Sequence, residues 1–470
     1  MGDRMLTRLR ISGFKNLLDI DIRLGPFTCI AGKNAVGKSN LFDAIRFLHL
    51  LTQHSIMEAV KLLRETKGRS PEPRSLFTSF GRYMAPEIRF VADLLINRDV
   101  EDDFGDQALA AISTLRYTLA FRLSNDSGTE RLELAEESLV PIAQEAARKD
   151  LGFPAKAPFK DSIIKGRRSQ SLISTTEGDE GSPLIRVHQE GHGGRMVAAP
   201  KSSRTVIGGL ASSDFPTILA VHREMESWRT LLLEPSAMRS AALYSDQRFI
   251  DNRGANLPAA IERLRRREDR KDQVYASLAN KLSELIEDVR ELRIKDDERT
   301  ETFTLEVSGR DGVFHPAGSL SDGTLRFLVL STLAIDPDTK GIICLEEPEN
   351  GIHPERIPVM VRLLRDIAVD SNFPVDADNP LRQVIINTHS PVVVTNIHPN
   401  DLIYFEEEQI VTEERETGKV ASPRVPPGTW RATPNRESHE LSIGQLRSYL
   451  STASEPNQLW LSSFDKGAAS

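Results

Sequence analysis

The sequence predicts an α/β fold in which a mixed central sheet is combined with an antiparallel sheet and an inserted, mostly helical arm. An apolar run at 27–31 reads as a buried strand, and it enters a glycine-rich loop that is followed by helical spacing over 40–51. Apolar and polar residues alternate strictly over 115–123, as in an antiparallel sheet with one face in water. Apolar strands return at 341–345 and 384–387, after a long interruption.

Composition and charge exclude several broad classes. Of the 470 residues, 39% are hydrophobic and 27% are charged, which is ordinary for a soluble globular protein. A net charge of −8 argues against a uniformly basic surface for nucleic acid, although it leaves room for a local basic patch. No window approaches the roughly 18 consecutive apolar residues of a membrane span, and the N-terminus lacks the pattern of a signal peptide. We therefore expect a cytoplasmic protein with no membrane segment.

The two cysteines, Cys29 and Cys344, lie in short apolar runs that read as buried strands. We expect them to serve as small apolar core residues. Two such cysteines indicate a reducing compartment and no disulfide framework.

The middle of the chain changes character twice. Between about 155 and 208, Lys, Arg, Ser, Gly and Thr dominate, and we expect a mobile insertion or loop. Its basic run at 165–168 has two interpretations, a phosphate contact or, as we prefer, a solvated loop. Apolar residues at helical spacing then predict one long helix over about 257–292. Basic and acidic residues interleave along that helix, so a salt-bridged face is preferred to a nucleic-acid site.

These changes divide the sequence into four parts. The family resemblance described below implies that residues 1–135 and 301–405 are the two halves of one α/β unit. Residues 136–300 form the inserted arm between them. Residues 406–470 form an extension that is polar and proline-rich at first and includes a short amphipathic helix at 443–450.

The first chemical motif is a phosphate-binding loop, the P-loop, at 32–39 (GKNAVGKS). Gly32 and Gly37 permit backbone angles and close approaches that a side chain would block. The loop N–H groups and the start of the following helix attract phosphate oxygens. Lys38 supplies a compact cation for the β- and γ-phosphates, and Ser39 supplies a hydroxyl for Mg²⁺. The motif therefore predicts binding of a nucleoside triphosphate with magnesium.

The second motif is an apolar strand that ends in two carboxylates, Glu346 and Glu347. Two glutamates at a strand end can be purely structural, but such a strand is the expected partner of a P-loop. We assign Glu346 to the metal ion and Glu347 to the polarisation of the attacking water.

The third motif places His389 directly after the apolar strand at 384–387. A histidine at this position can bond the γ-phosphate and sense its loss. A lone histidine is more often structural, but the order and spacing of the motifs favour the functional role.

The fourth motif is the segment 319–326, which opens a helical run. Small residues with free N–H groups at a helix start form an anion site. In isolation the preferred interpretation is an ordinary helix capped by Ser321 or Asp322.

Together, the motifs resemble those of the ATP-binding-cassette type of ATPase, and most of all the branch that contains RecF, the structural-maintenance-of-chromosomes (SMC) proteins and the overcoming-lysogenization-defect (OLD) ATPases. The resemblance covers roughly 1–135 and 300–405. The matching segments are the P-loop, 11–16 (ISGFKN), 320–324 (LSDGT), 346–354 (EEPENGIHP) and 388–391 (THSP).

The resemblance implies a head that pairs with a second copy, with two ATP molecules held between the copies. Ser321 and Gly323 of one copy would then meet the γ-phosphate bound by the other. ATP binding would close the dimer and hydrolysis would open it. The candidate ATP-binding residues are Gly32, Asn34, Gly37, Lys38, Ser39 and Asn40 of the loop and helix, with Lys15 and Asn16.

Three positions depart from the common pattern of the class. Ala35 stands where glycine is frequent, which is a mild change provided that its backbone φ is negative. Glu346 stands where aspartate is frequent. His353 replaces the aspartate of the transporters, as it does in the OLD-like branch, and this disfavours a transporter.

The motifs do not identify the partner protein of such an ATPase. Residues after about 405 lack an acidic cluster on a strand, so we expect no nuclease within this chain. By analogy with stand-alone bacterial heads of this type, we expect a homodimer or larger assembly that controls a separate effector, such as a nuclease, in anti-phage defence. Two alternatives stay open: a DNA-repair or recombination ATPase that binds DNA directly, and an ATP-dependent scaffold without hydrolysis. Contact with nucleic acid, direct or through the partner, also stays open.

Overall fold

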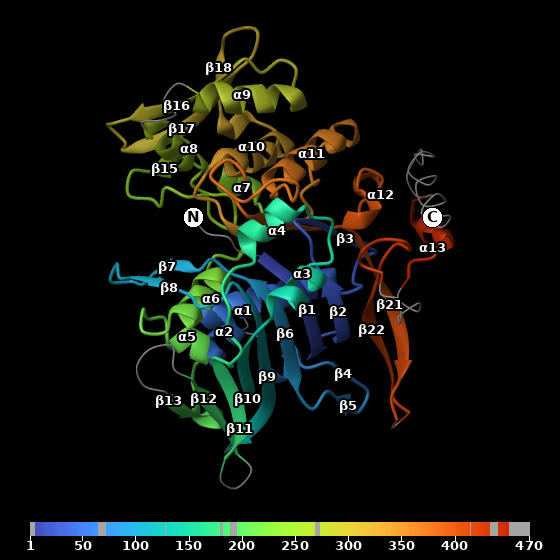
Figure 1. Ribbon diagram of the computed structural model, residues 1–470. Helices are drawn as coiled ribbons and strands as arrows, with labels where there is room; N and C mark the ends of the chain where they lie inside the picture. Colours follow the sequence, from blue (N-terminus) through green and yellow to red (C-terminus); the bar gives the residue numbers. More distant parts are fainter. Residues whose placement is uncertain are drawn as a thin grey trace.

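The protein is described here by a computed structural model that defines residues 5–63, 72–126, 128–178, 182–188, 195–267, 273–413, 415–432 and 440–450. Two large sheets meet in the middle of the molecule. Figure 1 shows the larger sheet in the lower half, β3 of the second sheet above it, β21 and β22 at its right side, and a group of helices at the top.

The larger sheet has eight antiparallel strands in the order β13-β12-β11-β10-β9-β6-β1-β2. Alternate residues of its long strands are buried, as the sequence pattern predicts for a sheet that packs through one face. Its strands are β1 (Met5–Phe14), β2 (Leu17–Arg23), β6 (Ile88–Leu95), β9 (Thr114–Asp126), β10 (Thr129–Pro141), β11 (Ile173–Glu177), β12 (Pro183–Val187) and β13 (Arg195–Ala198).

The second sheet has six strands in the order β14-β19-β20-β3-β21-β22. All neighbours pair in parallel except β22, which runs antiparallel to β21. These strands are β14 (Arg229–Leu231), β19 (Gly341–Glu346), β20 (Arg382–Thr388), β3 (Phe27–Gly32), β21 (Leu402–Val411) and β22 (Thr417–Arg424). Every residue of β3 and β20 is buried, which explains their continuous apolar runs.

Helices cover both faces of this parallel sheet. One hydrophobic core lies between the two large sheets and includes α1 (Lys38–Gln53), α2 (Ile56–Leu63) and α6 (Pro216–Glu226). The other core lies on the opposite face, where Figure 1 shows α8 to α11. Its helices are α8 (Leu257–Arg266), α9 (Val274–Leu285), α10 (Asp322–Ile335), α11 (Ile357–Ile367), α12 (Pro391–Val394) and α13 (Ile443–Leu450).

Smaller elements complete the fold. A third sheet packs beside α8 and α9, and two short hairpins extend from the main body. The third sheet contains β15 (Ala242–Leu243), β16 (Glu291–Asp297), β17 (Thr302–Ser308) and β18 (Phe314–Pro316). The hairpins are β4 (Ser79–Phe80) with β5 (Tyr83–Met84), and β7 (Asp99–Glu101) with β8 (Gln107–Leu109). The remaining helices are α3 (Gln144–Asp150), α4 (Ala157–Ile163), α5 (Val206–Gly209) and α7 (Pro235–Met238).

One buried glutamine joins the two large sheets. Gln383 on β20 accepts a hydrogen bond from Leu6 N at 3.0 Å. Its amide nitrogen donates to Leu6 O and to Gly25 O, both at 2.9 Å. Three backbone groups at the junction are thereby satisfied without water.

A buried carboxylate fixes a second junction. Glu137 on β10 is fully buried and accepts hydrogen bonds from Tyr117 Oη, Val206 N and Ile207 N at 2.8, 2.7 and 3.1 Å. Burial raises the pKa of Glu137 to about 7, although these three donors favour its charged form. The contact holds the start of α5 against the antiparallel sheet.

Most elements expected from the sequence are present. The predicted strand at 115–123 corresponds to β9. The helix after the P-loop is α1, and the predicted strands at 341–345 and 384–387 are β19 and β20. Cys29 and Cys344 are buried and unpaired with one another, and burial raises the pKa of both thiols.

The expectation of a mobile insertion at 155–208 is wrong for much of that segment. Residues 179–181 and 189–194 lie outside the described part, but α4, α5, β11 and β12 are regular. Ile173, Ile185 and Val187 are fully buried and extend the core of the eight-stranded sheet. The polar average over the whole segment concealed two short strands, of which β12 has alternating buried residues.

The expectation of one helix over 257–292 is also wrong. The segment contains α8, α9 and the first residues of β16, while 268–272 lie outside the described residues. Leu292 and Ile294 alternate with charged residues and pair with β17, so the two-residue period of a strand prevails there. Val289 lies in the connection before β16 and is buried, so it continues the apolar spacing of α9 without being part of a helix.

The inserted residues 136–300 are integrated into the fold. They supply β11 to β13 at one edge of the antiparallel sheet and β14 at one edge of the parallel sheet. The expected boundary between 405 and 406 falls inside β21. The division into four parts stays a prediction. Among the described residues, no helix has the length and apolarity needed to cross a membrane.

Candidate nucleotide-binding and catalytic site

The P-loop connects the end of β3 to the start of α1. Gly32 and Gly37 have φ angles of 146° and 107°, which side-chain-bearing residues rarely adopt. A Cβ atom at Gly32 would lie 2.3 Å from Phe405 O, and one at Gly37 would lie 2.6 Å from Asn16 Oδ1. Both motif glycines are therefore required by backbone conformation and by close contacts.

Lys38 begins α1 and lies beneath the loop. Its Nζ donates to Gly32 O at 2.7 Å and to Lys33 O at 2.6 Å. The side chain is 6% exposed, and burial lowers the pKa of Lys38, while the carboxylates of Glu347 and Glu349 oppose that shift. The ammonium group is thus held inside the P-loop by carbonyl oxygens that phosphate oxygens can replace.

Ala35 does not have the negative backbone φ that would make its replacement of glycine a mild change. Its φ is 65°, in the left-handed region, so the absence of glycine imposes strain on the turn of the P-loop. The change from glycine is therefore not a mild one.

Lys15, Asn16 and Asn40 lie beside the P-loop and hold it in place. Lys15 Nζ is 2.6 Å from Asp43 Oδ2 on α1. Asn40 Nδ2 donates to Asn16 Oδ1 at 2.8 Å. These contacts join the β1–β2 turn to α1; direct contacts with ATP stay a prediction for these residues and for Asn34, which is exposed on the loop.

Glu347 and His389 are brought together, although 42 residues separate them. β19 and β20 are adjacent parallel strands, so their carboxyl ends lie at one edge of the sheet. Glu347 Oε1 lies 2.8 Å from His389 Nδ1, and Asn350 Nδ2 donates to Glu347 Oε2 at 2.9 Å. Burial opposes ionisation of Glu347, but these bonds and the charges of His389 and Lys38 prevail and lower its pKa. An ionised glutamate in this position can accept a proton from water.

Glu347 also has an unusual backbone conformation. Its φ is 46°, and its N–H donates to both Asn387 O and Asn387 Oδ1 at 3.1 Å. The turn directs the side chain toward His389 on the neighbouring strand.

Ser39 and Glu346 fit the chemistry of a magnesium site. Ser39 is half-buried in the first turn of α1, and Glu346 ends β19 at the same edge of the sheet. A hydroxyl and a carboxylate are hard oxygen donors, and Mg²⁺ bound with a nucleotide takes its other ligands from phosphate and water. The donor set therefore fits the ion predicted from the sequence.

Sequence reasoning missed Glu349 and Thr388. Glu349 is 7% exposed, and one of its oxygens accepts a hydrogen bond from the fully buried Thr388 hydroxyl. Burial raises the pKa of Glu349, and its charge acts on Lys38. The third acidic residue of the Glu-Glu-Pro-Glu run is the signal that could have identified it.

Ser321 and Gly323 lie at the start of α10. Ser321 is the N-cap, and its Oγ accepts from Thr324 N at 3.2 Å. This confirms the ordinary capping role. Gly323 packs against the segment after β19, since a Cβ there would lie 2.3 Å from Gly351 O. The segment is therefore attached to the loop that carries Glu347, while its role toward a second ATP stays a prediction.

A groove beside the P-loop provides space for a ligand. Its volume is about 630 Å³, within the range of small-molecule sites. It is lined by Lys33, Asn34 and Val36 of the P-loop, residues 404–407 of β21, and Gly444 and Tyr449 of α13.

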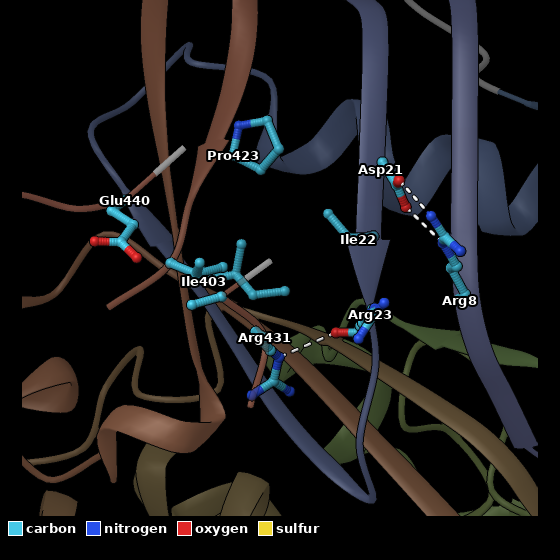
Figure 2. A pocket seen from close by; sticks show the side chains of 10 residues that line it. Arg8, Asp21, Ile22, Arg23, Ile403, Pro423, Arg431 and Glu440 are labelled. Atoms are coloured by element: carbon cyan, nitrogen blue, oxygen red, sulfur yellow. Dashed lines mark hydrogen bonds and ion pairs between the residues drawn. The ribbon is translucent and has the colours of Figure 1, made fainter. Parts of the chain in front are cut away.

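A second cavity, of about 150 Å³, lies away from the P-loop and contains none of the predicted site residues. Figure 2 shows Arg8 paired with Asp21 and Arg431 reaching the backbone oxygen of Arg23. Arg431 also donates to Thr28 Oγ1 at 2.8 Å. These contacts attach the segment after β22 to the β2–β3 turn, which is a structural role.

Comparison with protein families gives one match to this chain. The model of the family described as "AAA domain, putative AbiEii toxin, Type IV TA system" matches residues 27–136 and 212–395, more than half of the chain. The chain belongs to this family. The two matched parts contain the P-loop, the α10 segment, the β19 carboxylates and His389, and the unmatched part between them falls within the predicted insertion. The prediction of an AAA-family ATPase is confirmed at the level of this family.

Individual relatives are more distant. The DNA replication and repair protein RecF of Paenarthrobacter aurescens (strain TC1) is 37% identical over 60 residues, 13% of this chain and 15% of RecF. Three similar solved structures are SMC heads. One is bound to the C-winged helix domain of ScpA, one from Pyrococcus furiosus carries an extended coiled coil and is bound to the C-terminal domain of ScpA, and one is from Thermotoga maritima. Their identities are 11%, 10% and 11%, and their TM-scores 0.44, 0.42 and 0.37. Each alignment covers 89% of this chain and 97%, 96% or 98% of the other.

Proposed function

We propose that this protein hydrolyses ATP with Mg²⁺ in a composite site between two copies of the chain, and that the resulting change in assembly controls a separate effector protein. The observation that carries the proposal is the convergence of the P-loop, Glu347 and His389 at the carboxyl ends of β3, β19 and β20. Membership of an AAA-domain family supports nucleotide binding.

The residues have separate tasks in this reaction. The P-loop N–H groups and Lys38 bind the phosphates, and Lys38 exchanges its carbonyl partners for phosphate oxygens. Ser39 and Glu346 hold the magnesium ion, which supplies charge neutralisation. Glu347 orients the attacking water and accepts its proton. His389 holds the Glu347 carboxylate through Nδ1, and this bond is broken or kept according to the presence of the γ-phosphate.

The proposal includes a dimer because, within one chain, the neighbours found for Ser321 and Gly323 lie outside the P-loop. Gly323 contacts Gly351, whereas Gly37 of the P-loop contacts Asn16 and Ala421. Ser321 is exposed at a helix start whose N–H groups attract anions. A second copy can therefore present its ATP to Ser321 and Gly323.

The biological role is proposed from the family. Its description names a putative toxin of a toxin–antitoxin system, which is compatible with a defence role. We propose anti-phage defence with a partner effector, most simply a nuclease, because no nuclease motif was identified in this sequence. A cytoplasmic location follows from the same role.

Substitution of Glu347 by Gln tests the catalytic assignment. Steady-state phosphate release should fall at least 100-fold, while ATP binding is retained and the ATP-bound dimer lives longer in size-exclusion chromatography with light scattering. Glu355→Gln, an exposed neighbour, should behave like the wild type. Unchanged turnover in Glu347→Gln would reject the assignment, and a wild type that binds ATP and dimerises without releasing phosphate would favour a scaffold.

Direct DNA binding is the second candidate, since the DNA replication and repair protein RecF is similar to this chain over 60 residues. The basic stretch on α8 offers limited support, because its arginines are already paired with carboxylates: Arg263 with Asp336 and Asp338, Arg265 and Arg266 with Glu262, and Arg267 with Asp338. DNA binding that weakens steeply with salt, and turnover stimulated by DNA, would favour this function.

A further inference from the structure

A buried arginine on the α10 segment has no hydrogen-bond partner for its Nε among the described residues. Arg326 lies one turn after Ser321 and Gly323 and is 8% exposed. Its Nε is shielded from solvent. Burial lowers the pKa of Arg326, and the carboxylates of Asp322, Glu349 and Glu347 oppose that shift. A buried guanidinium normally pairs with a carboxylate, because desolvation of its charge is costly.

The buried carboxylate of Glu349, whose charge acts on Arg326, is incompletely satisfied as well. One oxygen of Glu349 accepts from Thr388, but Oε2 is buried and unpartnered within the described part of the chain. Arg326 and Glu349 carry opposite charges that interact electrostatically, and each has a buried polar atom without a hydrogen-bond partner among the described residues. This combination indicates an ion pair that is not formed in this state of the chain.

The two side chains belong to segments that are already attached to each other. Gly323 packs on Gly351, so α10 and the loop after β19 are in close contact at that point. Within that loop, Asn350 N donates to Glu347 O and Ile352 N donates to Glu349 O, at 3.1 and 3.0 Å. The loop that carries Glu347 is therefore a compact turn that moves as one unit.

We propose that Arg326 is a positioning residue for hydrolysis: it pairs with Glu349 when the Ser321 segment engages ATP held by a second copy, and this pairing fixes Glu347 toward the attacking water. The inference rests on the proposed function. Each chain then takes part in two ATP sites. Its Ser321 segment meets the ATP bound by the second copy, and this segment is joined to Glu347, which acts on the ATP bound by the same chain.

The test uses the full chain with Arg326→Met, Arg326→Lys, Glu349→Gln and the double variant Arg326→Met/Glu349→Gln. Arg326→Met should lower kcat at least 10-fold and change the Kd for ATP less than threefold. Its urea midpoint should equal or exceed that of the wild type, because an unpaired buried charge is removed. Arg326→Lys should recover kcat to within threefold of the wild type. The double variant should lose no more activity than the worse single variant.

Glu262→Gln is the matched control. Glu262 is a buried carboxylate of α8, 3% exposed, that is already paired with Arg265 and Arg266. Its substitution should lower the urea midpoint and leave kcat unchanged, the opposite of the result expected for Arg326→Met.

Three results would overturn the inference: wild-type kcat in Arg326→Met, activity losses that multiply in the double variant, or a urea midpoint that falls together with kcat. These differ from failure of the proposed function. If the wild type releases no more phosphate than Glu347→Gln, the ATPase proposal fails and the positioning role fails with it. If the wild type turns over and Arg326→Met does also, only the positioning role is lost.

Discussion

Replacing Gly37 by Ala should separate backbone strain from direct collision in the P-loop. Gly37 has a φ of 107°, and the added Cβ would lie 2.6 Å from Asn16 Oδ1, 2.7 Å from Asn16 Nδ2 and 2.9 Å from Ala421 Cβ. Gly105 has a similar φ of 87° with no atom within 4 Å of the corresponding position. Gly105→Ala therefore reproduces the strain without the collision.

The expected difference follows from these contacts. A left-handed conformation costs an alanine about 1–2 kcal/mol in either variant. In Gly37→Ala, Asn16 must also move, which removes the hydrogen bond from Asn40 and costs about 1 kcal/mol more. We expect a loss of about 2–3 kcal/mol for Gly37→Ala and about 1–2 kcal/mol for Gly105→Ala.

Urea unfolding with and without ATP measures both effects. At an ATP concentration of 100 times Kd, the wild type and Gly105→Ala should gain about 2.7 kcal/mol from the ligand. Gly37→Ala should gain less than about 1 kcal/mol, because the displaced loop no longer presents its N–H groups to the phosphates. If Gly37→Ala shows the same unfolding free energy and the same ATP gain as Gly105→Ala, the proposed fit between the P-loop and Asn16 is incorrect.

Three further changes test other parts of the fold by urea unfolding. Ala35→Gly should leave stability unchanged or raise it by up to about 1 kcal/mol, because left-handed strain is relieved, and it should retain ATP binding. The pKa of Glu137 is raised to about 7 in the folded state, so protonation of Glu137 stabilises the fold fully below its ordinary pKa of 4.5, and this stabilisation is lost as pH rises through 7. The free energy of unfolding should therefore fall by about 2.5 kcal/mol between pH 5 and pH 8. Glu137→Gln should remove that pH dependence. Gln383→Leu should cost about 3 kcal/mol, because Leu6 and Gly25 keep buried backbone groups without partners; a loss below 1 kcal/mol would show that this junction is unimportant.

The elements around the site could be predicted because their signals are local. β3, β19 and β20 each contain a short apolar run, and the P-loop glycines have φ angles that favour glycine. The strand β11 was missed because it has few apolar residues, and its stability comes from pairing with β10 and β12. Non-local pairing of this kind has no periodic trace in the sequence.

The site was predicted as a set of motifs, but its electrostatics were not. Nothing in the spacing shows that Lys38 is surrounded by carbonyl oxygens or that Lys15 is paired with Asp43. The same limit applies to Glu349, which is buried and accepts a hydrogen bond from Thr388 on β20. Charges acquire their partners from tertiary packing, so their roles appear only when the sheets are assembled.

The loop after β19 is the point at which these contacts meet. Glu347 accepts a left-handed φ of 46° that costs about 1 kcal/mol, and in return its N–H reaches Asn387 while its carboxylate reaches His389. An extended conformation would relieve the strain and turn the carboxylate away from His389. The same loop contacts Gly323 of α10 through Gly351. In the proposed dimer, a displacement at the start of α10 would be passed to the Glu347 carboxylate, and we propose this as the physical basis for coupling assembly of two copies to hydrolysis.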